Sequence, residues 1–245
     1  MILDHGCEWC KITPAILQQV DLGNPYPFSI GPKGRERLAQ LISRESYITI
    51  FSESSASVIN QKLRSEIALR LSAVNREKAE ALALWIIREW GGIRRRTQQS
   101  VVNWLENLGC FDDHSVRRFI RDQESSAQNG VSSWSKLLAF AAHMNYAIYD
   151  SRTATSLNCV LSLNNDPRRF YMPPSRNTAV QSAQAILSRE SNLKVRRYND
   201  YLALLNCITN NKKSETLLTA EMMLFSNAPM IAKTFIFAKT ERKKI

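Results

Sequence analysis

Residues 130–152, GVSSWSKLLAFAAHMNYAIYDSR, carry most of what the chain reveals about its fold and chemistry. Lys136 opens an apolar stretch with helical character over about 135–144, and an extended-looking run, Tyr146 to Tyr149, then leads to Asp150. Such a helix moves the chain about 13 Å away from Lys136, at roughly 1.5 Å per residue. The extended residues that follow span about 16 Å, at roughly 3.3 Å each, which is enough to return to it. The spacing predicts an amine and a carboxylate that face one pocket.

The length and composition indicate a globular protein without a membrane span. At 245 residues the chain suits one large domain or two closely packed lobes, and its hydrophobic content of 44% is ordinary for a folded domain. The longest apolar run, Ala81 to Ile87, is far shorter than the roughly 20 residues that a membrane helix needs. The N-terminus has no charged segment followed by an apolar one. We therefore expect a cytoplasmic protein that does not bind membranes.

The excess of positive charge points to a polyanionic partner. Thirty-three lysines and arginines against 22 acidic residues give a net charge of +11, which favours nucleic acid first and acidic membrane surfaces second. The alternative is a generally basic protein without such a ligand. Clustering of the cations favours DNA, and the clusters are Arg94-Arg95-Arg96, Arg117-Arg118 with Arg121, Arg168-Arg169, Lys194 with Arg196-Arg197, and Lys212-Lys213.

The cysteines give no sign of a disulfide framework or a metal centre. There are five of them at irregular spacing, and Cys7 and Cys10 form a single CxxC pair. A structural zinc ion needs four ligands, and no second pair lies at a suitable spacing. We expect structural thiols, no metal site and no cofactor.

Helical periodicity dominates the chain after residue 34. The sequence predicts one all-α domain over 1–245, with an irregular N-terminal arm over 1–34 that is rich in glycine and proline. Only 47–51 and 234–237 read as strands, too few for a substantial sheet. Asp113 is predicted to cap a helix over 114–122. Other expected helices lie near 58–71, 76–90, 101–108, 177–190, 194–209 and 215–226.

Lys136 and Asp150 have the chemistry for breaking a glycosidic bond. A neutral lysine attacks a sugar carbon, and burial and neighbouring cations favour the neutral form. Asp150 precedes a helix that begins at Ser151, so its carboxylate is expected to accept backbone N–H groups and to stay ionised. A fixed anion of this kind stabilises an oxocarbenium ion. The alternative is a solvated lysine on a first helical turn and an aspartate that only caps.

Short pieces of sequence around these two residues form a recognisable pattern. Gly130-Val131 leads to Ser135-Lys136, Ala147-Ile148-Tyr149 leads to Asp150, and Glu89-Trp90-Gly91-Gly92-Ile93 lies upstream. The pattern resembles the catalytic region of the helix-hairpin-helix superfamily of DNA glycosylases, and more closely the bacterial proteins with an 8-oxoguanine DNA glycosylase fold. In that superfamily a glycine-bearing hairpin leads to a lysine that starts a helix, and an apolar stretch delivers an aspartate to the next helix.

The resemblance implies a two-lobed helical fold with the active-site cleft between the lobes and a hairpin-like catalytic segment at 125–158. Lys136 would be the Schiff-base nucleophile, and Asp150 would stabilise the cation and help to move protons. The hairpin departs from the family pattern. In the best-known members several glycines grip a phosphate, whereas here only Gly130 remains, among several serines.

Further site residues are expected around this centre. Those expected to contact nucleic acid are Arg94, Arg95, Arg96, Gly130, Ser133 and Arg152. Candidates for the base pocket are Trp90, Trp134 and Tyr149, with core packing as the alternative for each tryptophan. His114 and His143 are interpreted as structural, and Phe225 and Phe235 lie in the part of the chain where relatives often sandwich the flipped base.

The expected function is a DNA N-glycosylase with AP-lyase activity that excises a modified, 8-oxoguanine-like purine. Two alternatives stay open at this point. The first is a nucleic-acid-binding module of the same fold whose lysine only contacts phosphate. The second is an enzyme of a phage-defence operon, with partner proteins from that operon, that acts on a modified base or nucleotide.

Overall fold

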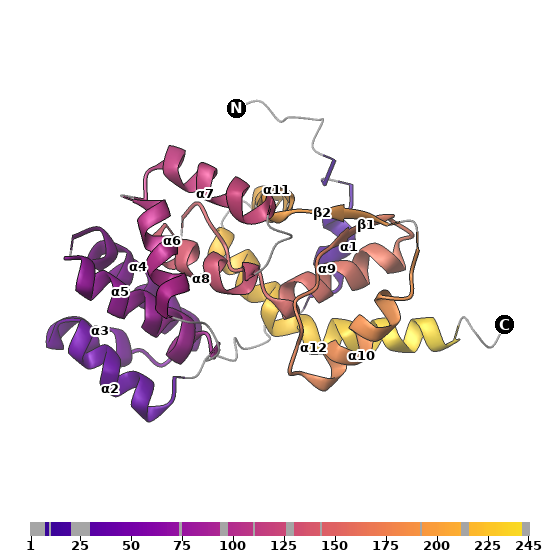
Figure 1. Ribbon diagram of the computed structural model, residues 1–245. Helices are drawn as coiled ribbons and strands as arrows, with labels where there is room; N and C mark the ends of the chain where they lie inside the picture. Colours follow the sequence, from indigo (N-terminus) through magenta and orange to yellow (C-terminus); the bar gives the residue numbers. More distant parts are fainter. Residues whose placement is uncertain are drawn as a thin grey trace. The chain divides into compact units, whose positions relative to one another are not determined.

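The fold is described from a computed structural model that covers residues 8–9, 11–20, 30–73, 75–93, 98–109, 111–125, 130–142, 144–191, 193–211 and 216–241. These residues form twelve α-helices, one π-helical segment and two strands of three residues each (Figure 1). The predicted all-α class is thereby confirmed. The chain divides into two compact units, with Pro25–Ile148 in unit 2 and both Met1–Asn24 and Tyr149–Ile245 in unit 1.

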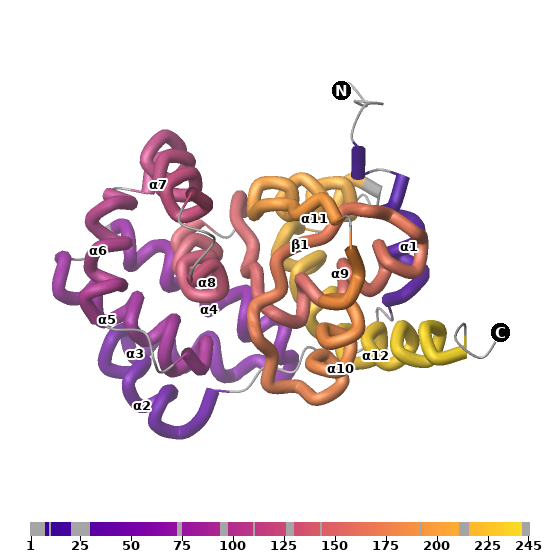
Figure 2. The backbone as a smooth tube through the Cα atoms, turned by 45° about the vertical axis from the view of Figure 1, so that its right-hand side comes forward, coloured from indigo at the N-terminus to yellow at the C-terminus, as the bar shows by residue number. Residues whose placement is uncertain are grey.

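Unit 2 is a helical bundle built around one apolar helix. Almost every residue of α8 from Val131 to Phe140 is buried, and α8 packs against α4, beside which it lies in Figure 2. Because nearly all of its residues are buried, α8 lies inside the core and forms the centre of this unit. The elements of unit 2 are α2 (Pro32–Leu41), α3 (Arg44–Phe51), α4 (Ala56–Ala73), α5 (Arg76–Trp85), η1 (Ile86–Trp90), α6 (Gln98–Leu108), α7 (Asp113–Ser125) and α8 (Val131–Ala141).

Unit 1 is organised around α9, whose residues from Thr153 to Ser162 are all buried. This helix packs along α12 and also contacts α10, α1 and β1 (Figure 1). The strands β1 and β2 pair in parallel, with Phe170 opposite Arg196. The elements of unit 1 are α1 (Thr13–Gln18), α9 (Ser151–Leu163), β1 (Arg168–Phe170), α10 (Thr178–Leu187), β2 (Lys194–Arg196), α11 (Tyr198–Asn211) and α12 (Leu217–Glu241).

The predicted strands were wrong, and the observed strands fall elsewhere. Residues 47–51 belong to α3 and residues 234–237 to α12, because a short apolar run can be half-buried in a helix as well as in a strand. The observed β1 is fixed by a distant side chain. The Asn158 amide donates to the Phe170 carbonyl at 2.8 Å, and the Phe170 N–H donates to Asn158 Oδ1 at 2.7 Å. A tertiary contact of this kind cannot be read from local sequence.

Several helix starts were also misplaced, including that of α11, which begins at Tyr198 and not near 194, because residues 194–196 form β2. The region 1–34, predicted to be an irregular arm, contains α1 and the start of α2, and each of these helices has a proline in its first turn. Proline there is favourable, because its missing N–H would have no helical partner. Asp112 rather than Asp113 caps α7, since Asp112 Oδ1 accepts from the Ser115 N–H at 2.9 Å.

None of the helices in the described residues has the length and apolar character of a membrane span.

The left-handed backbone at Gly130 gives a first prediction. Its φ of 82° precedes α8, and a residue with a Cβ is strained in that conformation by about 1–2 kcal/mol. We expect Gly130→Ala to lower the free energy of unfolding by about this amount in urea titrations. The matched control is Gly31→Ala, because Gly31 has an ordinary φ of −64° and nothing within 4 Å of an added Cβ.

In Gly31→Ala, alanine caps α2 less well than glycine does, but it also lowers the conformational entropy of the unfolded chain. Because these two effects oppose each other, the change in the free energy of unfolding should stay below about 1 kcal/mol. Equal losses in the two variants would show that the conformation at Gly130 is not what stabilises the start of α8.

Candidate active site

Gly130 sets the start of the helix that carries Lys136. The Gly130 carbonyl accepts the N–H groups of Ser133 at 2.7 Å and Trp134 at 3.0 Å, so α8 begins at Val131. The predicted start near residue 135 was therefore about one turn late. Serine has a modest helix propensity, and burial of Ser133 and Trp134 outweighs that propensity here.

Lys136 is buried and hydrogen-bonded. Lys136 is 5% exposed, and its Nζ donates to the carbonyl of Ser132, one turn earlier in α8, at 2.6 Å. The alternative of a solvated lysine on the first turn is therefore wrong. Burial favours the neutral form of an amine, which is the form that attacks an electrophilic carbon.

Gly91, the residue that follows η1, makes room for this lysine. A Cβ built on Gly91 would lie 2.8 Å from Lys136 Cδ, 2.9 Å from the Ile87 carbonyl oxygen and 3.0 Å from the Ile86 carbonyl oxygen. The Gly91 N–H donates to the Ile86 carbonyl at 2.8 Å, which is the wider hydrogen-bonding ring of a π-helix. Gly91, in the upstream piece of sequence at residues 89–93, thus lies against Lys136, and π-helical turns are frequent at functional sites.

An arginine that sequence reasoning missed lies in the same core. Arg64 of α4 is fully buried, and its guanidinium carbon is 5.6 Å from the centroid of the Trp90 ring and 5.4 Å from that of Phe140. The two rings meet edge to face, with centroids 4.9 Å apart. Aromatic faces compensate in part for the desolvation of a buried cation. No local signal distinguishes Arg64 from the other cations along α4, because its burial depends on packing against other segments.

Two other predicted residues of α8 are buried. Trp134 is 0% exposed and meets Phe119 of α7 edge to face, with centroids 6.0 Å apart. Ser133 is 2% exposed. This is the packing expected of core residues, and a contact of Trp134 with a base or of Ser133 with DNA remains a prediction.

Asp150 caps α9, as predicted. Its Oδ1 accepts the N–H groups of Arg152 at 2.9 Å and Thr153 at 3.1 Å, and the Asp150 N–H donates to Thr153 Oγ1 at 3.1 Å. This reciprocal arrangement is a capping box. Because the carboxylate lies at the positive end of the α9 dipole and holds two backbone donors, its position and orientation are fixed.

Tyr149 supports the aspartate from the core of unit 1. It is 1% exposed, its hydroxyl donates to the Tyr171 carbonyl at 2.5 Å, and its ring centroid is 5.0 Å from that of Tyr201. Burial raises the pKa of Tyr149 well above its usual value, so the hydroxyl remains a donor. A place for Tyr149 in a base pocket remains a prediction, whereas its role in anchoring the start of α9 follows from these contacts.

Arg152 and Phe225 lie together in unit 1. The Arg152 guanidinium carbon is 4.5 Å from the centroid of the Phe225 ring, next to the N-terminus of α9. Both residues are half-buried. Arg152 was expected to bind nucleic acid, and Phe225 was one of the two aromatic residues noted in the C-terminal part of the chain. Together they offer a ligand a positive charge and an apolar ring.

Several predictions fall outside what the structure describes. Arg94, Arg95, Arg96 and His143 lie among residues whose placement is not described. Lys136 belongs to unit 2 and Asp150 to unit 1, and each unit is described by itself. The proximity of the amine and the carboxylate, on which the sequence-based hypothesis depends, therefore stays a prediction. Within the described part of the chain there is no group of three or more His, Cys, Asp or Glu side chains arranged to hold a metal ion.

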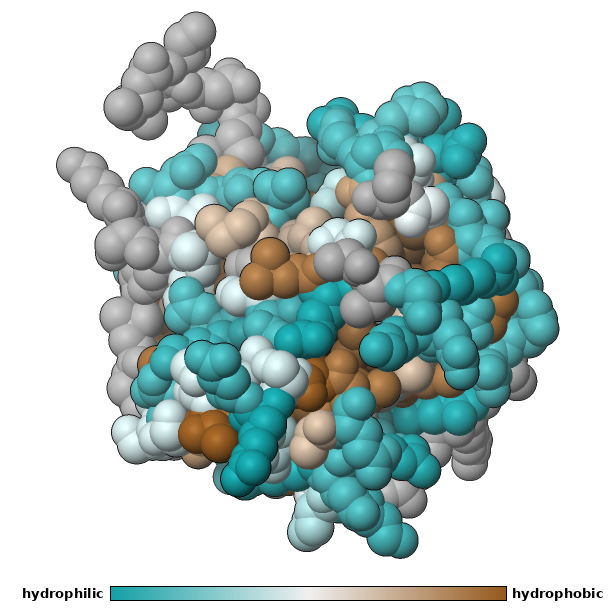
Figure 3. Space-filling model, turned by 90° about the vertical axis from the view of Figure 1, so that its left-hand side faces the viewer, coloured by the Kyte–Doolittle hydropathy of each residue, from teal (hydrophilic) through white to brown (hydrophobic). Residues whose placement is uncertain are grey.

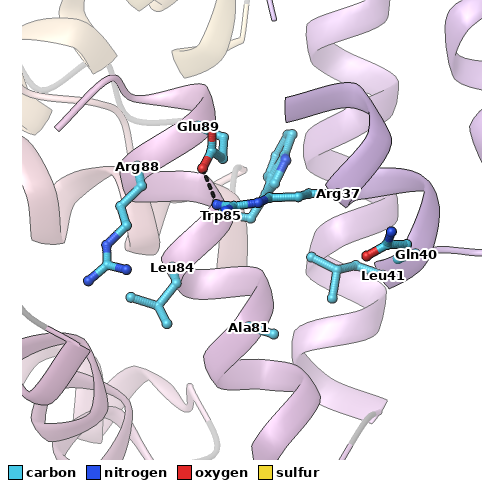
Figure 4. Close-up of a pocket in the computed structure, with 8 residues that line it drawn as sticks. All are labelled: Arg37, Gln40, Leu41, Ala81, Leu84, Trp85, Arg88 and Glu89. Atoms are coloured by element: carbon cyan, nitrogen blue, oxygen red, sulfur yellow. Dashed lines mark hydrogen bonds and ion pairs between the residues drawn. The ribbon is translucent and has the colours of Figure 1, made fainter. Parts of the chain in front are cut away.

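Unit 2 also contains a surface pocket of about 290 Å³ that the sequence did not indicate. An Arg37–Glu89 ion pair joins α2 to η1 beside it, and Figure 4 shows the Arg37 side chain directed toward Glu89. Figure 3 shows apolar side chains in furrows between hydrophilic ones on the face that it presents. The pocket is lined by residues of α2, α5 and η1, among them Arg37, Leu41, Leu84, Trp85, Arg88 and Glu89.

Comparisons of the chain with protein-family models, with curated proteins and with solved structures give no match.

The close approach of Gly91 and Lys136 gives a second prediction. In Gly91→Ala the new methyl group would overlap the lysine side chain and two backbone carbonyls, so we expect a loss of about 1–3 kcal/mol in the free energy of unfolding. The displaced amine should also react faster with an acylating reagent, as measured by mass spectrometry of the peptide that contains Lys136.

Gly92→Ala is the matched control for this experiment. Gly92 has a φ of 66° and nothing within 4 Å of an added Cβ, so that variant strains the backbone without touching the lysine. Acylation of Lys136 at the parent rate in Gly91→Ala, or equally accelerated acylation in the two variants, would contradict the predicted contact.

Proposed function

We propose that the protein is a DNA N-glycosylase with associated lyase activity that removes a modified purine, on a two-lobed fold of the helix-hairpin-helix glycosylase type. The observation that carries the proposal is the burial of Lys136 against Gly91. A buried lysine is costly for a fold and is seldom kept only for packing. Here it lies on the helix that follows a left-handed glycine, where the resemblance places the nucleophile.

The proposed reaction begins with extrusion of the damaged nucleotide from the DNA stack, at a cost of roughly a few kcal/mol. The bond between the base and C1′ breaks, the base leaves with the bonding electrons, and positive charge develops on the sugar. The neutral amine of Lys136 attacks C1′ and gives, after ring opening and loss of a proton, an imine. Removal of a proton from C2′ then eliminates the 3′ phosphate and nicks the strand.

Asp150 is the proposed partner that stabilises the developing cation. Its Oδ1 is held by two backbone N–H groups, so the carboxylate does not have to reorganise as charge appears. The proposal requires that Asp150 and Lys136 reach the same sugar.

An exposed row of arginines on α7 supports DNA as the substrate. Arg118 and Arg121 are both exposed, one turn apart, on the helix that precedes Gly130. Their neighbour Arg117 is paired with Asp113 at 2.9 Å. We propose that Arg118 and Arg121 contact phosphates on the strand whose nucleotide is extruded, in addition to the arginines at 94–96 and Arg152.

The nucleophile is tested by borohydride trapping. We expect sodium borohydride to reduce the imine between the parent protein and an oligonucleotide duplex with an abasic site, and to give a covalent adduct on denaturing gels. Lys136→Ala should lose the adduct, because no amine remains at that position. The matched control is Lys62→Ala, since Lys62 lies on α4 of the same unit and is paired with Glu53.

Adduct formation by Lys136→Ala at the parent level would overturn the assignment of the nucleophile. Tight binding of the abasic duplex by a parent protein that neither nicks nor is trapped would identify a non-catalytic DNA-binding module instead.

The DNA surface is tested through its salt dependence. The logarithm of the binding constant falls with the logarithm of the salt concentration by about 0.9 per neutralised phosphate. We expect the double variant Arg118→Gln/Arg121→Gln to bind duplex DNA more weakly and to reduce this slope by about 2. Arg76→Gln is the control, because Arg76 is already paired with Glu80 and Glu106. An unchanged slope in the double variant would exclude α7 from the DNA contact.

A further inference from the structure

Thr153 occupies a central position at the N-terminus of α9. It is 0% exposed, and its Oγ1 accepts the Asp150 N–H at 3.1 Å while lying 3.4 Å from Asp150 Oδ1 and 3.2 Å from the Asp150 carbonyl oxygen. One hydroxyl thus touches the backbone and the carboxylate of the same aspartate. The bond from the Asp150 N–H to Thr153 Oγ1 is the second half of the capping box, and the approach of Oγ1 to Asp150 Oδ1 adds a contact with the carboxylate itself.

A tyrosine from another helix holds this threonine in turn. Tyr201 of α11 is 0% exposed, and its hydroxyl forms a hydrogen bond with the Thr153 hydroxyl. Burial first, and then the charge of Glu221 on α12, raise the pKa of Tyr201 well above its usual value, and Asp150 acts in the same direction. The phenol therefore stays neutral, so the Thr153 and Tyr201 hydroxyls form a neutral pair beside the aspartate.

The surroundings leave this pair little freedom to move. Tyr201 is enclosed by Tyr149, whose ring centroid is 5.0 Å away, and by Tyr198 at 6.1 Å, and Thr153 lies on the fully buried face of α9. A buried hydroxyl that loses its partner carries a desolvation penalty, so the hydrogen bond between the two residues is strongly favoured. The orientation of Asp150 is thus determined by the core of unit 1 and not by the cap alone.

We propose that Thr153 and Tyr201 are positioning residues for Asp150: Tyr201 fixes the Thr153 hydroxyl, and Thr153 fixes the rotamer of the carboxylate toward the sugar. This inference rests on the proposed function, and it assigns to that function two residues that do not touch the substrate. A carboxylate that is misplaced by even about 1 Å loses much of its effect on a transition state, which can amount to a hundredfold in rate.

The experiment compares variants that differ by one hydroxyl. Thr153→Val keeps the shape of threonine and loses the hydroxyl, Thr153→Ser keeps the hydroxyl, and Tyr201→Phe removes only the phenolic oxygen. The probe is a duplex with one 8-oxoguanine, because nicking at that position requires the glycosidic bond to break first, and Asp150→Asn is the reference for loss of the carboxylate. The rate of nicking is measured in single turnover, together with the dissociation constant of the duplex and the melting temperature of each variant.

We expect Thr153→Val to nick at least about tenfold more slowly than the parent, with an unchanged dissociation constant. Thr153→Ser should restore most of the rate, and Tyr201→Phe should lie between these two variants. A purely structural cap would instead lower the melting temperature of Thr153→Val without slowing nicking well below that temperature.

The outcomes separate this inference from the proposed function. Slow nicking by Asp150→Asn with parent rates in Thr153→Val and Tyr201→Phe overturns the inference alone. If Asp150→Asn nicks at the rate of the parent protein, the assignment of Asp150 is overturned. If the parent protein itself does not nick, the lyase proposal is overturned. In both cases the inference about Thr153 and Tyr201 is overturned as well.

Discussion

The close contact between the Lys136 side chain and the backbone of Gly91 constrains the rest of unit 2. A buried amine is tolerated only where its methylenes are packed and its nitrogen has an acceptor, and both conditions are met here by Gly91 and by the Ser132 carbonyl. No side chain fits at position 91, and the π-helical turn of η1 brings the backbone there. The early start of α8 at Val131 places Lys136 in the second turn of the helix, where it is enclosed by the core.

Asp150 is held in a different way. It lies at the end of a helix, is half-buried, and takes its orientation from hydrogen bonds to backbone donors and from Thr153 behind them. The lysine is thus fixed mainly by packing and the aspartate mainly by directed hydrogen bonds. This difference suits the proposed chemistry, because a nucleophile has to move toward its target whereas an electrostatic stabiliser works best when it is already in place.

The sequence predicted the features that depend on local pattern. The all-α class, the helix after Asp150 and the termination of a helix near Gly91 follow from periodicity, an N-cap residue and paired glycines. The failures have a common origin in contacts between distant segments. The strand at Phe170 depends on Asn158, the depth of Arg64 depends on Trp90 and Phe140, and the place of Thr153 depends on Tyr201. The two members of each pair belong to different elements of the fold, so the local pattern around one residue does not reveal its partner.

The division of the chain has a consequence for biogenesis. Unit 2 is continuous, whereas unit 1 combines Met1–Asn24 with Tyr149–Ile245. In unit 1, Trp9 stacks on Phe170 at 5.4 Å, and Glu8 pairs with Arg196 at 3.0 Å. During synthesis on the ribosome, unit 2 can therefore complete its core before Phe170 and Arg196, which Trp9 and Glu8 contact, have been synthesised. The entropic cost of closing a loop grows only slowly with its length. Early folding of unit 2 shortens the flexible chain between the two segments of unit 1, and this lowers the entropic cost of bringing them together.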